Sequence, residues 1–370
     1  MTLRMHRLVV GPVLMTLTAC ASPEAAAPLE RVVVAPDGRG FALAESGAPF
    51  VPWGFNYDHD RDVRLLEEYW VDGWDEVVAD LGEIRALGAT VVRLHLQVAA
   101  FMTGPDTVDE AALARLRELA TVAARLGLRL DITGLAAYRG AADPPWYVAL
   151  PEAARWEAQA RFWDAVAERL AGDPVVFAYD LVNEPLVPTD VRTDWTPGEF
   201  AGLSFVQCLV LELGARDPAA VAHAWRMAMK AAIRAHDPDV LITVGQFPFT
   251  TQPGFTPAEV AADLDYLSVH LYPETGKMDA SLGVLAAFAA AGRPVVVEEI
   301  GPLNCSAEEL GQFITDSRAY ATGWIGFYWG QTPAEFGAGK RYALFANELR
   351  APKTTSPPRC SCRGSTSSSA

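Results

Sequence analysis

Short runs of apolar, β-branched and aromatic residues alternate with longer amphipathic stretches along most of the chain. Eight of these runs have the length and composition of buried strands. They cover residues 50–56, 90–96, 128–135, 175–183, 241–247, 266–272, 294–300 and 324–329. The pattern therefore predicts a sheet of eight strands.

Amphipathic stretches with the period of an α-helix lie between the predicted strands. They cover residues 75–87, 109–126, 152–170, 218–236, 279–291 and 306–320. Successive strand-then-helix units give parallel strands with right-handed crossovers, and eight such units close a barrel. We therefore expect an α/β protein of the (β/α)8 TIM-barrel class. An open, doubly wound sheet is the alternative, but no glycine-rich phosphate loop follows the first predicted strand.

Two short apolar runs flank Asp37 and Gly38, a dipeptide that is a strong signal for a hairpin turn. We expect a β-hairpin here that caps the bottom of the barrel. No linker interrupts residues 31–350, which we interpret as one domain. Residues 351–370 have no hydrophobic period, and we expect them to be disordered.

The first twenty residues have the features of an export signal. Two arginines precede an apolar run over residues 8–17, which is too short for a membrane span. The sequence LTAC that ends at Cys20 resembles a bacterial lipobox, with cleavage before Cys20 and lipidation of its thiol. Residues 1–20 would then be the signal peptide and residues 21–30 a tether. We expect an exported, membrane-anchored lipoprotein; an ordinary secretory signal is the alternative.

Composition and charge narrow the class of ligand. Hydrophobic residues make up 51% of the chain, which suits a folded domain with a large core. The net charge of −16 argues against nucleic acid, because phosphate backbones are bound by clustered Lys and Arg. We expect a monomer that binds a neutral carbohydrate without a cofactor or metal. Cys208 and Cys305 could form a disulfide in an exported protein or remain two buried thiols.

Polar residues gather at the carboxyl ends of the predicted strands, where (β/α)8 barrels carry their active sites. Two of them are carboxylates, Glu184 after the fourth strand and Glu299 in the seventh. The other polar or aromatic residues at these ends include Asn56, Arg93, His95, Asn183, His270, Tyr272 and Trp329. Glycosidic bond cleavage needs one carboxylic acid to protonate the leaving oxygen and a second carboxylate to attack or stabilise the sugar carbon. Glu184 and Glu299 would supply both groups.

The motifs around these residues resemble those of glycoside hydrolase family 5 and the wider clan A of barrel glycosidases. The resemblance rests on WGFN, VVRLHL, NEP after the fourth strand and EIG after the seventh. It implies hydrolysis of a β-linked polysaccharide or oligosaccharide with retention of configuration. Glu184 would be the acid/base, Glu299 the nucleophile, and Asn183 a donor to the 2-hydroxyl of the sugar.

The resemblance also implies roles for the surrounding side chains. Arg93 and Tyr272 would hold Glu299 ionised and oriented. His270 would lie near the acid/base, and Trp329 would form the floor of the −1 sugar site. Asn56 and His95 are further candidates for substrate binding.

Two carboxyl groups with different duties need different pKa values. Donors from Arg93 and Tyr272 are expected to lower the pKa of Glu299, whereas partial burial and nearby negative charge should raise that of Glu184.

Three features depart from the simplest interpretation. Members of the family commonly carry a His at the end of the third strand, where this chain has Thr133, and His95 or Tyr138 could fill the space.

Glu298 is a rival nucleophile, but side chains alternate along a strand, so only one of the two glutamates should face the mouth. The acidic cluster 58–62 looks like a metal site, and a charged surface loop explains it equally well.

Substrate selectivity is expected in the longest connection, residues 185–239, which should overhang the active face. Tryptophans in or near the top loops could stack on sugars, although each is better explained as a core residue. These are Trp70, Trp74, Trp146 and Trp195.

Two other classes of protein remain open. A catalytically silent carbohydrate-binding lipoprotein would keep the aromatic floor, but the presence of both Glu184 and Glu299 argues against it. A metal-dependent barrel hydrolase lacks the paired His expected after the first strand.

If Cys20 is the lipidated residue, replacing it should abolish attachment of the acyl chain. Cells that express the protein should incorporate labelled palmitate into the wild type and lose that label in Cys20→Ser. Equal labelling of the two proteins would contradict lipidation at Cys20.

Overall fold

Eight parallel strands form the wall of a barrel in a computed structural model, which describes residues 28–60, 62–200 and 202–330. Around the sheet the strand order is β12-β9-β8-β5-β4-β15-β14-β13. These strands are β4 (Trp53–Tyr57), β5 (Val91–Gln97), β8 (Arg129–Ala136), β9 (Val176–Asp180), β12 (Leu241–Thr243), β13 (Leu267–His270), β14 (Val295–Ile300) and β15 (Gly323–Gly326). The order is that of a (β/α)8 barrel, and the predicted fold class is confirmed.

Main-chain hydrogen bonds join the two ends of this sheet. Asp265 N donates to Ile242 O at 3.0 Å, and His270 N donates to Gln246 O at 2.8 Å. These bonds bring the segment after β12 beside β13, so the barrel is nearly closed.

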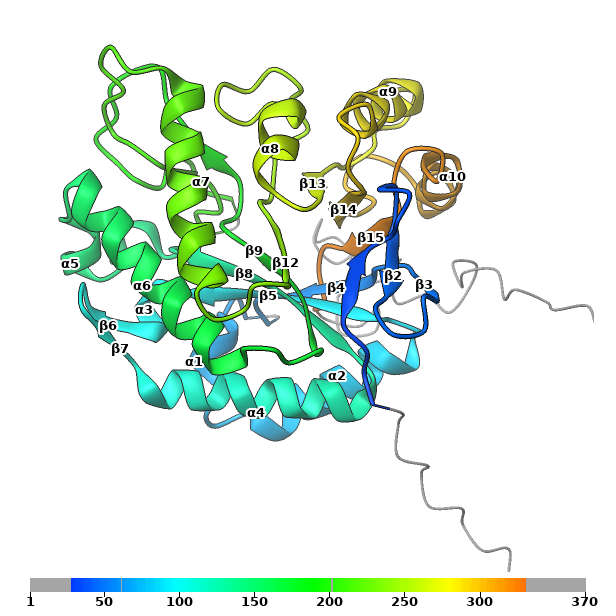
Figure 1. Ribbon diagram of the computed structural model, residues 1–370, viewed down its shortest axis with the longest axis horizontal. Coiled ribbons are helices and arrows are strands. Elements are labelled where there is room, and N and C mark those ends of the chain that lie inside the picture. The colour runs from blue at the N-terminus through cyan, green and yellow to red at the C-terminus, as the bar shows by residue number, and fades with distance from the viewer. Residues whose placement is uncertain (1–27, 61, 201, 331–370) are drawn as a thin grey trace, which may run out of the picture.

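The helices surround the strands, as Figure 1 shows. The longer ones are α2 (Trp74–Ala86), α4 (Glu110–Leu126), α6 (Glu152–Leu170), α7 (Pro218–Arg234), α8 (Pro257–Asp263), α9 (Met278–Ala289) and α10 (Ala307–Ser317). Short helical turns are α1 (Leu66–Tyr69), α3 (Val98–Phe101), η1 (Gly140–Ala142) and α5 (Pro145–Val148). The six predicted helices are present, and α8 was not predicted because its seven residues are too few to show a period.

Side-chain caps fix several helix starts. Asp109 accepts from the main-chain N–H groups of Ala111 and Ala112, and Ser306 and Glu309 form the predicted capping box. Among the described residues, none of the helices combines the length and hydropathy that a membrane crossing would need.

A small antiparallel sheet covers the bottom of the barrel. It consists of β1 (Val32–Val34), β2 (Phe41–Leu43) and β3 (Pro49–Phe50). Phe41 packs edge-on against Phe177 and Tyr266, with ring centroids 5.3 and 5.4 Å away. The predicted hairpin cap is confirmed, and β3 extends it. The prediction that the first barrel strand begins at Phe50 was wrong, because Phe50 pairs with β2.

The long connection after β9 carries a parallel pair of its own, β10 (Pro185–Leu186) and β11 (Gln207–Cys208). Cys208 is a buried free thiol, so the structure does not join it to Cys305 by a disulfide. A second small hairpin, β6 (Met102–Gly104) and β7 (Thr107–Val108), follows α3. The signal peptide, Cys20, most of the predicted tether and the predicted disordered tail lie outside the described residues.

Candidate active site

Glu299 lies at the carboxyl end of β14, where two donors from other strands reach it. Arg93 in β5 donates from Nη1 to Glu299 Oε1 at 2.9 Å. Tyr272, two residues after β13, donates from its hydroxyl to Oε2 at 2.7 Å. Both carboxylate oxygens are therefore held, and the orientation of the group is fixed.

Glu184 occupies the matching position beyond β9. Its main chain has a φ of 45°, and its N–H donates to Gly245 O at 3.1 Å, so the chain leaves the sheet at this residue. The Glu184 side chain is 15% exposed, and its Oε1 lies 3.0 Å from Nδ1 of His270. The carboxyl group therefore faces the barrel mouth with one fixed neighbour.

The two glutamates are close together. Nδ1 of His270 also lies 3.5 Å from Oε1 of Glu299. One carboxylate oxygen of Glu184, one of Glu299 and a ring nitrogen of His270 all lie within 4.8 Å of one another. In the described part of the chain, these three residues form the group whose donor atoms lie close enough together to hold a metal ion. The same arrangement places two carboxyl groups at one side of the barrel mouth.

Burial raises the pKa of both glutamates, but not equally. The pKa of Glu184 is raised well above its ordinary value, first by burial and then by the negative charge of Glu299. Burial also raises the pKa of Glu299, while Arg93 and the Tyr272 hydrogen bond oppose it. The expectation of a pKa below the ordinary value for Glu299 was wrong, because burial outweighs both donors. The expected contrast between the two carboxyls remains, with Glu184 as the group that keeps its proton.

Arg93 connects the residues of this site. It is completely buried, and Nη1 donates to Asn56 Oδ1 at 2.8 Å as well as to Glu299. Nη2 donates to Asp180 Oδ2 at 2.6 Å and to Asn183 Oδ1 at 2.9 Å. One guanidinium therefore positions both Glu299 and Asn183, the residue that precedes Glu184.

Asn56 and His95 lie behind the nucleophile. Both are completely buried, and Asn56 Nδ2 donates to the main-chain oxygen of Glu298 at 2.8 Å. His95 Nε2 lies 2.9 Å from Asn56 Oδ1 and 3.1 Å from Arg93 Nη1. Neither side chain reaches the cavity described below. Their place fits support of Arg93 better than the predicted contact with substrate.

The position of the expected third-strand His is filled in a different way. Thr133 donates from its hydroxyl to Asp180 Oδ2 at 2.9 Å. Tyr138 lies with its hydroxyl oxygen 2.5 Å from Nδ1 of His95. A series of side-chain contacts therefore runs from Tyr138 through His95 and Asn56 to Arg93.

Glu298 points to a different environment from Glu299. Tyr266 donates to its Oε1 at 2.8 Å, Ser268 donates to Oε2, and Arg93 Nε lies 3.5 Å away. Burial raises the pKa of Glu298 to about 7. The register shifts within β14, which allows both adjacent glutamates to meet Arg93. Only Glu299 of the two lines the cavity.

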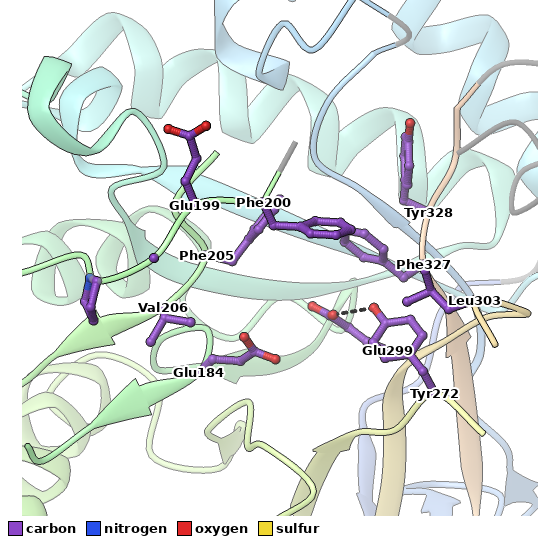
Figure 2. A pocket seen from close by; sticks show the side chains of 12 residues that line it. Glu184, Glu199, Phe200, Phe205, Val206, Tyr272, Glu299, Leu303, Phe327 and Tyr328 are labelled. Carbon is purple, nitrogen blue, oxygen red and sulfur yellow. Dashed lines mark hydrogen bonds between the residues drawn. The ribbon is translucent and has the colours of Figure 1, made fainter. Parts of the chain in front are cut away.

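A cavity of about 360 Å³ opens above the two glutamates. Figure 2 shows Glu184, Glu299 and Tyr272 on one side and several aromatic rings on the other. Its lining residues are Glu184, Pro197, Gly198, Glu199, Phe200, Phe205, Val206, Tyr272, Glu299, Leu303, Phe327 and Tyr328. The predicted overhang of the long connection supplies residues 197–200 together with Phe205 and Val206.

Trp329 does not line this cavity, in contrast to its predicted role as the floor of a sugar site. It is 3% exposed and packs edge-on against Phe55, with ring centroids 5.5 Å apart. Strand β15 ends at Gly326, and Trp329 N donates to Asn56 O at 2.7 Å, which directs this residue into the core. Phe327 and Tyr328 are the aromatic residues after this strand that line the cavity.

The remaining candidates lie apart from the cavity lining. Asp58 is paired with His59 at 2.8 Å, and Asp60 with Arg64 at 2.6 Å. Trp70 and Trp195 are buried, Arg115 lies over the Trp74 ring, and Trp146 packs on Tyr147.

Comparison with known proteins gives the family. The family model described as Cellulase (glycosyl hydrolase family 5) matches residues 57–333. The chain belongs to glycosyl hydrolase family 5. It is a glycoside hydrolase.

Solved structures share the fold at low identity. The exo-β-1,4-mannosidase Op5Man5 from Opitutaceae bacterium strain TAV5 is 19% identical with a TM-score of 0.63, over 86% of this chain and 61% of that one. This chain thus spans less than two thirds of that neighbour. An alanine variant of GH5_18 from Streptomyces cattleya, in complex with Manβ1-4GlcNAc, is 19% identical with a TM-score of 0.59, over 83% and 82%. The endo-1,4-β-mannanase from Rhizomucor miehei is 16% identical with a TM-score of 0.58, over 87% and 99%. No curated protein sequence matches the chain.

Several residues of this family 5 site were not identified from the sequence. Asp180 ends β9 and accepts from Gly245 N at 2.7 Å as well as from Arg93, and its place at a strand end was the available signal. Phe205 and Leu303 lie in irregular loops, where no period indicates which side chains face the cavity.

A side chain at Gly245 should disturb this hydrolase. A Cβ there would lie 2.9 Å from His270 Nε2 and 3.1 Å from Arg93 Nη2. We expect Gly245→Ala to lose most glycosidase activity and about 1 to 3 kcal/mol of the free energy of unfolding, measured in urea. Gly283→Ala is the matched control, because nothing lies within 4 Å of its Cβ in α9. Wild-type activity and stability of Gly245→Ala would contradict the prediction that a Cβ at this position disturbs His270 and Arg93.

Proposed function

We propose that this family 5 protein is a retaining hydrolase that cleaves a β-linked glycoside by double displacement. One observation carries the proposal: carboxylate oxygens of Glu184 and Glu299 lie within 4.8 Å of each other. Retaining enzymes hold their carboxyl groups about 5 to 5.5 Å apart, whereas inverting enzymes leave about 6.5 to 9.5 Å for a water molecule. The separation supports the retaining class.

Each glutamate has the environment that its step requires. Glu184 keeps its proton because its pKa is raised, so it can protonate the leaving oxygen. Glu299 is held by Arg93 and Tyr272, which stabilise the carboxylate and orient it toward the sugar carbon. The C1–oxygen bond breaks as the Glu299 ester forms. Glu184, now ionised, then removes a proton from the water that cleaves the ester.

The supporting residues have separate roles. His270 positions the Glu184 carboxyl, and burial lowers the pKa of His270 so that the ring is neutral. Asn183 is anchored by Arg93 and donates to Phe205 O at 3.1 Å, which leaves its second amide hydrogen for the substrate.

The sugar is proposed by analogy with the structural neighbours. Their titles describe a β-1,4-mannosidase, a β-1,4-mannanase and a complex with Manβ1-4GlcNAc. We infer that a β-mannoside is the first substrate to test, within a panel of aryl β-glycosides and polysaccharides.

Two alanine variants should separate the roles of the glutamates. Glu299→Ala should lose turnover of every substrate, because no covalent ester can form. Glu184→Ala should still be glycosylated by an aryl glycoside with a good leaving group, but its deglycosylation should be slow. Azide needs no general base, so it should accelerate Glu184→Ala and yield a β-glycosyl azide of retained configuration.

The pH profile supplies a second measurement on the same variants. The wild type should lose kcat/KM as the pH rises through the raised pKa of Glu184, and Glu184→Ala should lack this alkaline limb with an activated substrate. Azide with Glu299→Ala should instead give the inverted α-product. A wild type without turnover on any glycoside would favour the silent carbohydrate-binding alternative.

We also infer that the enzyme is an exported lipoprotein and acts as a monomer outside the cytoplasmic membrane. The support is the lipobox-like sequence that ends at Cys20 and the preceding apolar run.

A further inference from the structure

The cavity beside the catalytic pair is polar on one side and apolar on the other. Glu184, Glu299 and Tyr272 form its polar floor at the strand ends. Phe200, Phe205 and Phe327 lie opposite them in Figure 2. Pro197, Val206 and Leu303 add aliphatic groups, whereas the Glu199 carboxylate and the Tyr328 hydroxyl point away from Glu184 and Glu299 in Figure 2. The described side chains of the walls above the floor therefore present mostly carbon atoms to a ligand.

Aromatic contacts hold part of this wall in place. Phe205 packs edge-on against Tyr138, with centroids 4.8 Å apart, and against Phe327 at 6.0 Å. Phe327 is also edge-on to Tyr272 at 6.4 Å. Because each ring is fixed by another, the apolar surface exists before a ligand binds.

The polar groups of the floor are already committed to the reaction. Tyr272 donates to Glu299, whose other oxygen accepts from Arg93. Asn183 donates one amide hydrogen to the main-chain oxygen of Phe205. Hydroxyl groups that leave water need hydrogen-bond partners, and an unpaired hydroxyl is costly to bury. The floor can satisfy one reacting sugar, whereas the described side chains of the walls offer a second sugar only the carboxylate of Glu199 and the hydroxyl of Tyr328.

The leaving group must lie on the apolar side. Glu184 can protonate the glycosidic oxygen only if that oxygen and its alcohol lie next to Glu184. Gln207 N donates to Glu184 O at 3.4 Å, and β11 runs parallel to β10 with Gln207 beside Pro185. Phe205 and Val206 directly precede Gln207. The departing alcohol therefore meets the Phe205–Val206 wall.

We propose that the leaving-group site takes an apolar aglycone, an alkyl or aryl alcohol, in preference to a further sugar. This inference rests on the proposed hydrolytic function and names the substrate class of the same site. The cavity of about 360 Å³ is near the lower end of the range for ligand pockets, which suits a single sugar with a compact aglycone.

A series of alkyl β-glycosides tests this assignment without changing the leaving-group chemistry. The sugar is the one that the wild type cleaves as an aryl glycoside, and the aglycones run from methyl to hexyl, with benzyl and a β-linked disaccharide alongside. The alkyl alcohols differ little in acidity, so kcat/KM reports contacts with the wall. We expect kcat/KM to rise roughly fourfold for each methylene that becomes buried. Benzyl and hexyl glycosides should both exceed the disaccharide, and the better of the two shows whether the natural alcohol is aromatic or aliphatic.

A pair of valine variants locates the effect. Val206→Ser places a hydroxyl on the wall and should flatten the dependence on chain length. Val191→Ser, at a position 72% exposed in the same connection and outside the cavity lining, should keep the wild-type dependence. An unchanged slope in Val206→Ser would overturn the assignment of the wall.

The result for the wild type separates this inference from the proposed function. If the wild type cleaves the disaccharide and its kcat/KM does not depend on alkyl chain length, the proposal of an apolar aglycone is wrong and the proposed hydrolytic function stands. Failure to cleave any glycoside in the series or the aryl panel would overturn both proposals.

Discussion

A single buried cation holds the active site together. Arg93 has no exposed surface and contacts Glu299 at 2.9 Å, Asp180 at 2.6 Å and Glu298 at 3.5 Å. Burying one charge without partners is costly, and so is burying several carboxylates without a cation. The three acids of β9 and β14 and the guanidinium therefore require each other. Because Arg93 also anchors Asn183, the segment that leads to the acid/base depends on the same charge.

We propose opposite roles for two glutamates because their surroundings differ. Glu299 receives a cation and a phenol, which stabilise the carboxylate against the effect of burial. Glu184 has neutral His270 beside it and the charge of Glu299 nearby, which favour the protonated form. In the proposed mechanism, position in the barrel, rather than residue identity, decides which glutamate attacks and which protonates.

The fold and the centre of the site could be predicted from the sequence, because both follow regular geometry. Parallel strands converge at their carboxyl ends, so Glu184, Arg93, His270, Tyr272 and Glu299 meet wherever eight such strands close a barrel. The structure brings all five together.

Irregular geometry could not be predicted in this way. Trp329 was placed in the site because it follows the last strand, but β15 ends early and Trp329 enters the core, leaving Phe327 at the mouth. A shift of register in β14 lets Glu298 and Glu299 share Arg93 despite strand alternation. The side chains of the long loop after β9, such as Phe205, follow no period at all. We propose that these loop residues select the substrate, whereas the residues at the strand ends carry out the reaction.

Trapping the covalent intermediate tests the central claim most directly. A 2-deoxy-2-fluoro glycoside with an activated leaving group slows the second step more than it prevents the first, so the glycosyl ester should accumulate. Mass spectrometry of the digested protein should then find the fluorosugar on Glu299, with Glu298 unmodified. A label on Glu298, or turnover with inversion and no trapped ester, would contradict Glu299 as the nucleophile of a double displacement.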